Sequence, residues 1–253
     1  MLRVIPVLLL EGHGLVKTTG FAKPVYVGDP RNVVRIFNEK EVDELILLER
    51  RASKQHRPID YDIVREIVSE AFMPVCYGGA VRTVSEARTL LRLGVEKVAV
   101  NSAALEDLGI VRRLSDEFGA QCVVGSVDVR RDRLGRARVH SHAGIKPPEP
   151  DPVRWVRALA EAGAGEVLVQ SVDRDGTLQG PDLKLLRSLE GVIERPLIVG
   201  GGLGGLEHMK EAVKACHPSG LAVGARFVFY GPHRAVLVTY LERDEIDSLS
   251  HVV

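Results

Sequence analysis

The strongest constraint on the fold is that the second half of the chain repeats the first half at a shift of about 122 residues. Three pairs of segments align: PVCYGGAVRTVSEA (74–87) with PLIVGGGLGGLEHM (196–209), DELILL (43–48) with GEVLVQ (165–170) and, shifted by one residue more, VAVNSA (98–103) with LAVGAR (221–226). A fixed internal period is the signature of a repeated architecture. The sequence therefore predicts a molecule built from two similar halves.

Apolar runs rich in Val, Ile and Leu alternate with amphipathic stretches along the chain. The strand candidates are 3–10, 44–49, 74–77, 97–101, 122–128, 166–172, 196–199 and 221–224. The helix candidates are 31–40, 60–71, 84–93, 106–118, 151–162, 182–190, 206–215 and 232–242, with one or two more amphipathic turns in the tail 241–253. Strands without polar alternation are typical of parallel sheets covered on both faces. The pattern predicts an α/β fold, a (β/α)8 TIM barrel of two half-barrels, with a doubly wound open sheet as the alternative.

The chain shows no low-complexity linker and no break in composition, so we expect a single barrel domain over residues 1–253. The segment 129–147 is too long for a plain connection between a strand and a helix. Its Leu-Gly turn lies between alternating residues, which predicts a small hairpin after strand five.

Composition limits the functional classes. Basic and acidic residues number 34 each, which argues against broad electrostatic capture of nucleic acid or a membrane. Cys76, Cys122 and Cys216 are far apart and lack the spacing of metal ligands, so we expect reduced packing residues, no metal site and a cytoplasmic location. We expect His140 and His142 to be solvated rather than a metal pair. The N-terminal apolar run is too short to span a bilayer and lacks a signal-peptide cleavage site.

Glycine-rich turns follow strands three and seven, and small residues follow strands four and eight. In barrels, loops of this kind offer backbone N–H groups to phosphate. Two such sites on opposite sides of the barrel mouth suit a substrate with a phosphate at each end. The alternative is that the glycines serve only tight turns. The GGGLGG run at 200–205 lacks the spacing of a dinucleotide-binding loop.

These features together resemble one family, the cyclase subunit of imidazole glycerol phosphate synthase. The resemblance rests on DRDGT (173–177), VNSAA (100–104), GAGE (163–166) and the two Gly-Gly turns, and it runs in order from Arg3 to about Tyr240. It implies a twofold-repeated barrel that needs no cofactor. It also implies a HisH-like glutaminase subunit docked at the N-terminal barrel face, with the delivered ammonia used at the C-terminal face to close an imidazole ring.

The resemblance also implies roles for individual residues. Asp128 matches the general acid/base after strand five, and Lys17 matches a lysine of the mobile loop after strand one. The matching phosphate-binding positions are Gly79, Asn101, Ser102, Asp175, Gly176, Gly201, Gly202 and Gly224. The matching ammonia gate at the barrel bottom is Arg3, Glu44, Lys97 and Glu166.

The gate has a physical rationale. Its four residues lie at or near the starts of strands one, two, four and six. Two cations and two anions that face one axis neutralise each other, so their burial is tolerable as a hydrogen-bonded ring. Such a ring closes the barrel floor and can admit a small neutral molecule such as NH₃. The alternative is a set of ordinary surface ion pairs.

The chain departs from the family at its strand-one acid. The repeat places Leu9 opposite Asp128, where the family carries an aspartate at both positions, and Leu9 cannot transfer a proton. Glu11 lies two residues on, about 6–7 Å further along the strand, which is too far without a rearranged loop. Six more positions depart: Ala80 for a third glycine, Glu49 for an aspartate, Arg50 and Arg51 for apolar and hydroxyl residues, and Leu203 and Ala225 for small residues of the second phosphate site.

These departures are similar to a second branch, the paralogues associated with glycosyl amidation. The matching segments are LLLEGHGLVKT (8–18), VGDPRNVVRIFNEKEVDEL (27–45), CYGG (76–79) and FVFYGPHRAVLVTY (227–240). This resemblance implies a barrel that relays ammonia from a glutaminase to a sugar amidotransferase for a surface polysaccharide. An authentic cyclase, a lyase of histidine biosynthesis, is the first alternative. A phosphosugar isomerase on the same barrel is the second.

Overall fold

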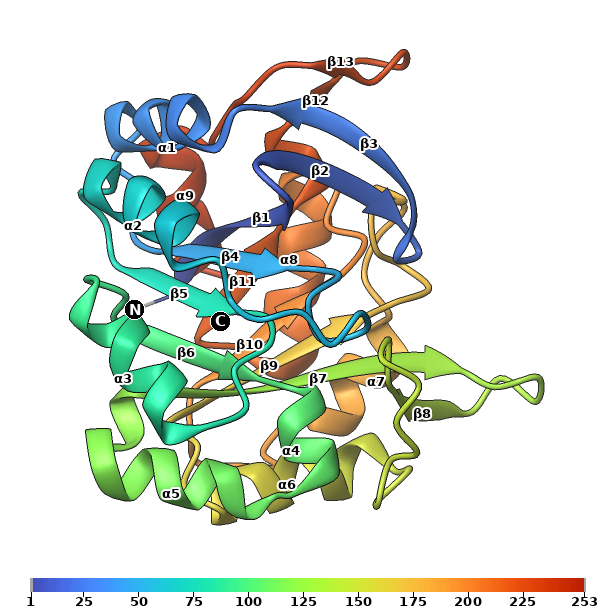
Figure 1. Cartoon of the computed structure of the whole chain (residues 1–253). Helices are drawn as coiled ribbons and strands as arrows, with labels where there is room; N and C mark the ends of the chain where they lie inside the picture. Colours follow the sequence, from blue (N-terminus) through green and yellow to red (C-terminus); the bar gives the residue numbers. More distant parts are fainter. Residues whose placement is uncertain (1, 253) are drawn as a thin grey trace.

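The computed structural model describes residues 2–252. Eight parallel strands form a closed barrel in the order β11-β10-β9-β7-β6-β5-β4-β1, and β11 pairs again with β1 (Figure 1). The barrel strands are β1 (Arg3–Glu11), β4 (Leu45–Glu49), β5 (Val75–Gly78), β6 (Lys97–Val100), β7 (Val123–Arg131), β9 (Glu166–Ser171), β10 (Leu197–Gly200) and β11 (Gly220–Val223). Because β1 and β11 pair from Arg3 with Gly220 to Pro6 with Val223, the sheet is a TIM barrel and not a doubly wound sheet.

Helices cover the outside of the barrel (Figure 1). They are α1 (Pro30–Glu39), α2 (Tyr61–Glu70), α3 (Val84–Arg92), α4 (Ser102–Glu106), α5 (Gly109–Phe118), α6 (Pro152–Glu161), α7 (Leu183–Leu189), α8 (Leu206–Cys216) and α9 (Arg243–Ser250), with short 3₁₀ turns η1 (Ala120–Cys122) and η2 (Ala225–Phe227). Their starts are well specified. Asp29 caps α1 ahead of Pro30, and Thr83 and Glu86 form a capping box on α3. No helix within residues 2–252 is long and apolar enough to cross a membrane.

Apolar side chains fill the inside of the barrel. The inner cluster is Ile5, Val7, Ile46, Cys76, Ala99, Val124, Leu168, Ile198 and Ala222, and Leu9 and Leu48 pack against it. A larger cluster lies between the strands and the helices and includes the buried Trp155. The barrel strands therefore bury apolar side chains on both faces, which explains the uninterrupted Val, Ile and Leu runs. Cys76, Cys122 and Cys216 form no disulfide.

The strand registers confirm the half-barrel repeat at the mouth. Leu9 pairs with Leu48 in the first half, and Asp128 pairs with Gln170 in the second. Leu48 and Gln170 are 122 residues apart and thus correspond under the repeat. Leu9 therefore occupies the position in the first half that Asp128 occupies in the second, as the sequence predicts.

Hairpins extend the barrel at three places. The predicted hairpin after strand five is present, because β8 (Ala137–His140) pairs antiparallel with the end of β7. A second hairpin, β2 (Gly14–Thr19) with β3 (Ala22–Gly28), continues β1 where the sequence indicates only a loop. The third, β12 (Phe229–Tyr230) with β13 (Ala235–Val236), lies where the sequence predicts a helix.

The prediction of a helix over 232–242 is wrong. The segment is extended: Leu237 N–H donates to the Val228 carbonyl at 3.0 Å, and Thr239 N–H donates to the Phe227 carbonyl at 2.9 Å. Its residues include the β-branched Val236, Val238 and Thr239, which favour extended backbone over helix. The final helix, α9, begins only at Arg243, after a capping box formed by Glu242 and Glu245.

Candidate functional site at the barrel mouth

Two adjoining cavities lie at the carboxyl ends of the barrel strands. The first has a volume of about 160 Å³ and includes Gly79, Asn101 and Ser102 in its wall. The second has a volume of about 60 Å³; the predicted site residues in its wall are Lys17, Asp175, Gly176, Gly201, Gly202 and Gly224. Both cavities share Leu9, Phe21, Leu48, Ser126 and Asp128. The mouth is thus one site with two lobes, and it brings together every predicted phosphate-binding residue.

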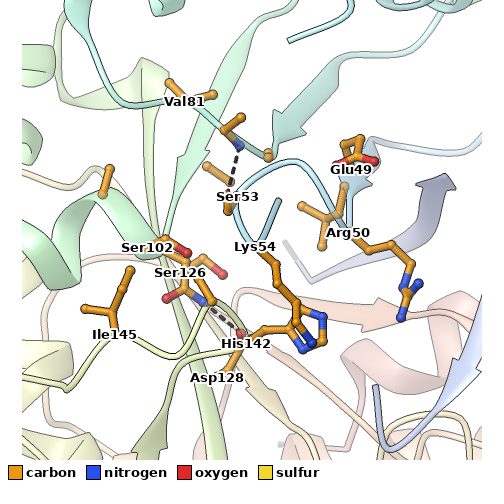
Figure 2. Close-up of a pocket in the computed structure, with 18 of the residues that line it drawn as sticks. Glu49, Arg50, Ser53, Lys54, Val81, Ser102, Ser126, Asp128, His142 and Ile145 are labelled. Carbon is orange, nitrogen blue, oxygen red and sulfur yellow. Dashed lines mark hydrogen bonds between the residues drawn. The ribbon is translucent and has the colours of Figure 1, made fainter. Parts of the chain in front are cut away.

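Asp128 lies where the two lobes meet. Asn101 Nδ2 donates to Asp128 Oδ2 at 2.9 Å, the bond drawn as a dashed line beside Asp128 in Figure 2. Burial raises the pKa of Asp128 to about 7, helped by the negative charge of Asp175 and opposed by the Asn101 hydrogen bond. A carboxyl group with this pKa can accept or donate a proton near neutral pH.

Lys17 and Asp175 occupy the second lobe. Lys17 is only 4% exposed, and its Nζ donates to the Val7 carbonyl. Desolvation lowers the pKa of Lys17 to about 8, against the attraction of Asp175. Asp175 accepts hydrogen bonds from Thr18 Oγ1 at 2.8 Å and Gln170 Nε2 at 3.3 Å, while burial raises its pKa.

Glu11 does not replace the missing acid. Its carboxylate pairs with the guanidinium of Arg50 and, at 2.8 Å, with that of Arg51. It contributes to neither cavity wall, whereas Leu9 contributes to both. Glu11 is therefore held in ion pairs with both arginines, of which Arg50 also lines the first cavity and Arg51 lines neither.

The glycine loops have the same conformation in the two halves. Gly79 and Gly201 have φ of +124° and +103°, and the next residues, Ala80 and Gly202, have φ of +57° and +84°. A side chain on Gly79 would lie 2.6 Å from the Glu49 carbonyl oxygen, so this turn requires glycine. Ala80 N–H donates to Ser53 Oγ at 3.1 Å (Figure 2). The tight turns therefore account for the glycines by themselves, and phosphate binding stays a prediction.

The predicted gate residues lie together at the opposite end of the barrel. Arg3 Nη1 contacts Glu44 at 2.5 Å and Glu166 at 3.1 Å, and Lys97 Nζ contacts the same carboxylates at 2.9 and 3.2 Å. Their side chains are between 3% and 22% exposed. The four residues form a closed ring of alternating charge rather than separate surface pairs.

Several residues of the mouth could not be identified from the sequence patterns. Phe21, at the β2–β3 turn, contributes to both cavities and lies edge-on to His142 with ring centroids 6.0 Å apart. Lys54 and His142 line the first lobe (Figure 2). His140 and His142 are half-buried rather than fully solvated, and desolvation lowers the pKa of each. Within residues 2–252, no cluster of His, Cys, Asp and Glu could hold a metal ion.

Comparison with known proteins places the chain in a family. A model described as histidine biosynthesis protein matches residues 3–233. The chain is 46% identical to the putative imidazole glycerol phosphate synthase subunit hisF2 of Pseudomonas aeruginosa, over 97% of this chain and 98% of the relative. It is 40% identical to the putative subunit hisF3 of Vibrio vulnificus, over 94% and 92% of the two chains. It is 38% identical to the putative subunit HisF of Leptospira interrogans, over 98% of each. The chain therefore belongs to the histidine biosynthesis protein family, as a HisF-like barrel.

Proposed function

We propose that this chain is the barrel subunit of a glutamine amidotransferase complex. It receives ammonia from a glutaminase subunit docked at the N-terminal face and relays it through the barrel for amidation of a surface-polysaccharide sugar. The observation that carries the proposal is the contrast between the two ends of the barrel. The floor has a complete ring of four charges, while the mouth has Leu9 in place of a second acid.

The barrel interior supports a route for a neutral molecule. Between the charged ring and the mouth, the inner cluster consists of apolar side chains, several of them small, such as Cys76, Ala99 and Ala222. An apolar interior disfavours an ion but not neutral NH₃. The relatives hisF2 and hisF3 are named as putative subunits of imidazole glycerol phosphate synthase, which supports a complex with a glutaminase.

An authentic cyclase of histidine biosynthesis is the second candidate, and Asp128 favours it. Its pKa of about 7 suits a group that both accepts and donates a proton. Lys17, buried in the adjoining lobe, could hold one phosphate of a bisphosphate substrate. Leu9 weakens this candidate because ring closure in the family uses two carboxylates.

One set of proteins separates the two candidates: wild type, Asp128→Asn and Leu9→Asp. The first assay follows ammonia-driven release of aminoimidazole from the family's ribulosyl-formimino bisphosphate substrate. The second follows ¹⁵N from the glutamine amide into the sugar, in a complex reconstituted with a glutaminase and a sugar amidotransferase. For a relay we expect no ring closure by wild type, and equal transfer by wild type and Asp128→Asn.

A cyclase gives the opposite pattern. Wild type then closes the ring, and Asp128→Asn loses that activity because an amide cannot shuttle the proton. Ring closure by wild type without nitrogen transfer to the sugar contradicts the relay. Ring closure gained only in Leu9→Asp identifies the missing acid as the cause of the lost chemistry.

A further inference from the structure

Two hairpins beside the mouth carry most of the exposed apolar side chains. Seven large hydrophobic residues are exposed within residues 2–252, and five of them lie on or next to these hairpins. The five are Val25 and Tyr26 on β3, Tyr230 on β12, Val236 on β13 and the following Leu237, each between 49% and 65% exposed. We name these five residues the rim surface. Such a concentration of exposed apolar groups is typical of an interaction site.

Both hairpins are held by the same loop of the mouth. Arg234, in the β12–β13 turn, donates to the Gly176 carbonyl at 3.0 Å. Gly20, in the β2–β3 turn, donates its N–H to the Asp175 carbonyl at 2.9 Å. Figure 1 shows the two hairpins on one side of the barrel, at the top of the view. The turns of both hairpins therefore contact the loop that lines the second lobe, and the rim surface lies on or next to the strands that these turns join.

Besides its exposed apolar side chains, β3 has a free backbone edge that a partner could bind. It is the last strand of its sheet, so one edge of its backbone has no described strand beside it. Residues 22–26 are all exposed, which means that neither face of this part of the strand is covered. Exposed edges of this length are normally shortened, blocked or covered. Pro24 removes one backbone donor, but the exposed Val25 and Tyr26 leave an apolar edge.

The charge of the hairpins indicates the chemistry of the partner. Residues 14–28 and 228–239 contain no aspartate or glutamate, while Lys23 and Arg234 are basic. A complementary surface would be apolar with carboxylates around it. Two exposed tyrosines beside an open strand edge favour a protein over a lipid surface, because Tyr is enriched at protein interfaces and a strand edge recognises another backbone.

We propose that the rim surface is the docking site for the enzyme that accepts the ammonia, an inference that rests on the proposed relay. Ammonia that leaves the mouth into water is protonated and diluted. A relay therefore needs its acceptor to sit against the mouth, and the rim surface is the exposed apolar area on the two hairpins whose turns contact the loop of the second lobe. The acceptor is an amidotransferase that presents an apolar patch edged by carboxylates.

Affinity for the purified sugar amidotransferase, measured by biolayer interferometry, tests this proposal. The variants are Tyr26→Ser with Tyr230→Ser, and separately Val236→Ser with Leu237→Ser. All four side chains are exposed, so the barrel keeps its fold, which circular dichroism verifies. We expect at least a tenfold loss of affinity for the tyrosine pair, since aromatic residues dominate interface energetics. Leu134→Ser, 75% exposed on the β7–β8 turn, is the matched control and keeps wild-type affinity.

Nitrogen transfer gives the second readout. The rim variants should lose glutamine-driven amidation, yet keep amidation driven by added ammonium and keep activation of the glutaminase. Unchanged affinity in both double variants overturns the docking site. Two other outcomes also overturn the docking site. In these, the wild type dimerises or binds phosphatidylserine vesicles, and the rim variants abolish that behaviour while they keep their affinity for the amidotransferase. Tight, rim-dependent binding without nitrogen transfer contradicts the relay and leaves the docking site standing.

Discussion

At the scale of single residues, the two halves of the barrel differ most at Leu9 and Asp128. The two positions correspond in strand register, but one carries an apolar side chain and the other a carboxyl group. Leu9 and Asp128 line both lobes of the mouth, so one side of the site offers an apolar side chain where the other offers a carboxyl group. Burial raises the pKa of Asp128 to about 7 despite the hydrogen bond that Asn101 donates to its carboxylate.

The raised pKa of Asp128 makes stability depend on pH. The folded protein holds this proton up to about pH 7, whereas an unfolded aspartate releases it near 3.9. The protonated Asp128 therefore contributes its full amount to the free energy of unfolding below about pH 3.9, the pKa in the unfolded chain. This contribution is lost as pH rises through 7. We expect the free energy of unfolding of Asp128→Asn to rise by about 1–3 kcal/mol relative to wild type between pH 4.5 and 8. This range allows for screening of Asp128 by solvent in the cavity. Chemical denaturation at several pH values measures this.

The control for this measurement has the opposite sign. Hydrogen bonds from the Arg136 and Leu134 backbone N–H groups and from the Arg136 side chain lower the pKa of Asp132 to about 2. Asp132→Asn should therefore lose stability relative to wild type above pH 4 rather than gain it. A stability difference between Asp128→Asn and wild type that does not change with pH would contradict the assigned environment of Asp128.

At the scale of elements, the sequence predicts the barrel well and the connections poorly. The apolar runs predict parallel strands that are covered on both faces. The internal repeat predicts that Leu9 in the first half corresponds to Asp128 in the second. The hairpin β2–β3 has no such constraint, because most of β3 is exposed and hydrophobic pattern carries no signal there. The pairing of Glu11 with Arg50 depends on the path of the loop after β4, which local pattern does not encode.

The loop after β10 offers a sharp test of backbone geometry. Gly202 has φ of +84°, and a Cβ there would lie 2.1 Å from the Gly180 carbonyl oxygen. Gly202→Ala should therefore cost about 2–4 kcal/mol and displace the wall of the second lobe. Gly205, three residues on, is extended with no heavy atom within 4 Å of its ideal Cβ, so Gly205→Ala should cost about 1 kcal/mol or less. Thermal unfolding of the two variants compares them, and equal midpoints would refute the close contact.

At the scale of the whole molecule, the charged ring joins elements that are distant in sequence. Arg3 opens β1, Glu44 directly precedes β4, Lys97 opens β6 and Glu166 opens β9. The sequence shows four charges at strand starts but not that they meet, because that requires the barrel to close. Each carboxylate of the ring contacts both cations, so removing one cation affects the whole floor.

Lys97→Met leaves Glu44 and Glu166 with Arg3 alone. We expect the free energy of unfolding to fall by about 3 kcal/mol, because a largely buried charge that has lost its partner is strongly destabilising. Arg88→Met, which breaks the exposed pair of Arg88 with Glu117, should cost about 1 kcal/mol or less. Urea denaturation of the two variants gives the comparison. If Lys97→Met costs no more than Arg88→Met, the ring is not the buried network described here.

The closure of β1 onto β11 also sets an order of events during synthesis. The edge of β1 from Arg3 to Pro6 has its partner only at residues 220–223, close to the end of the chain. A ribosome adds roughly 5–20 residues per second, so this edge emerges about 10–40 s before its partner exists. Tyr240 then donates to the Val4 carbonyl at 2.6 Å, fastening the last segment over the first strand. Until residues 220–223 have been made, the nascent chain cannot close the barrel, and this apolar edge of β1 lacks its native strand partner.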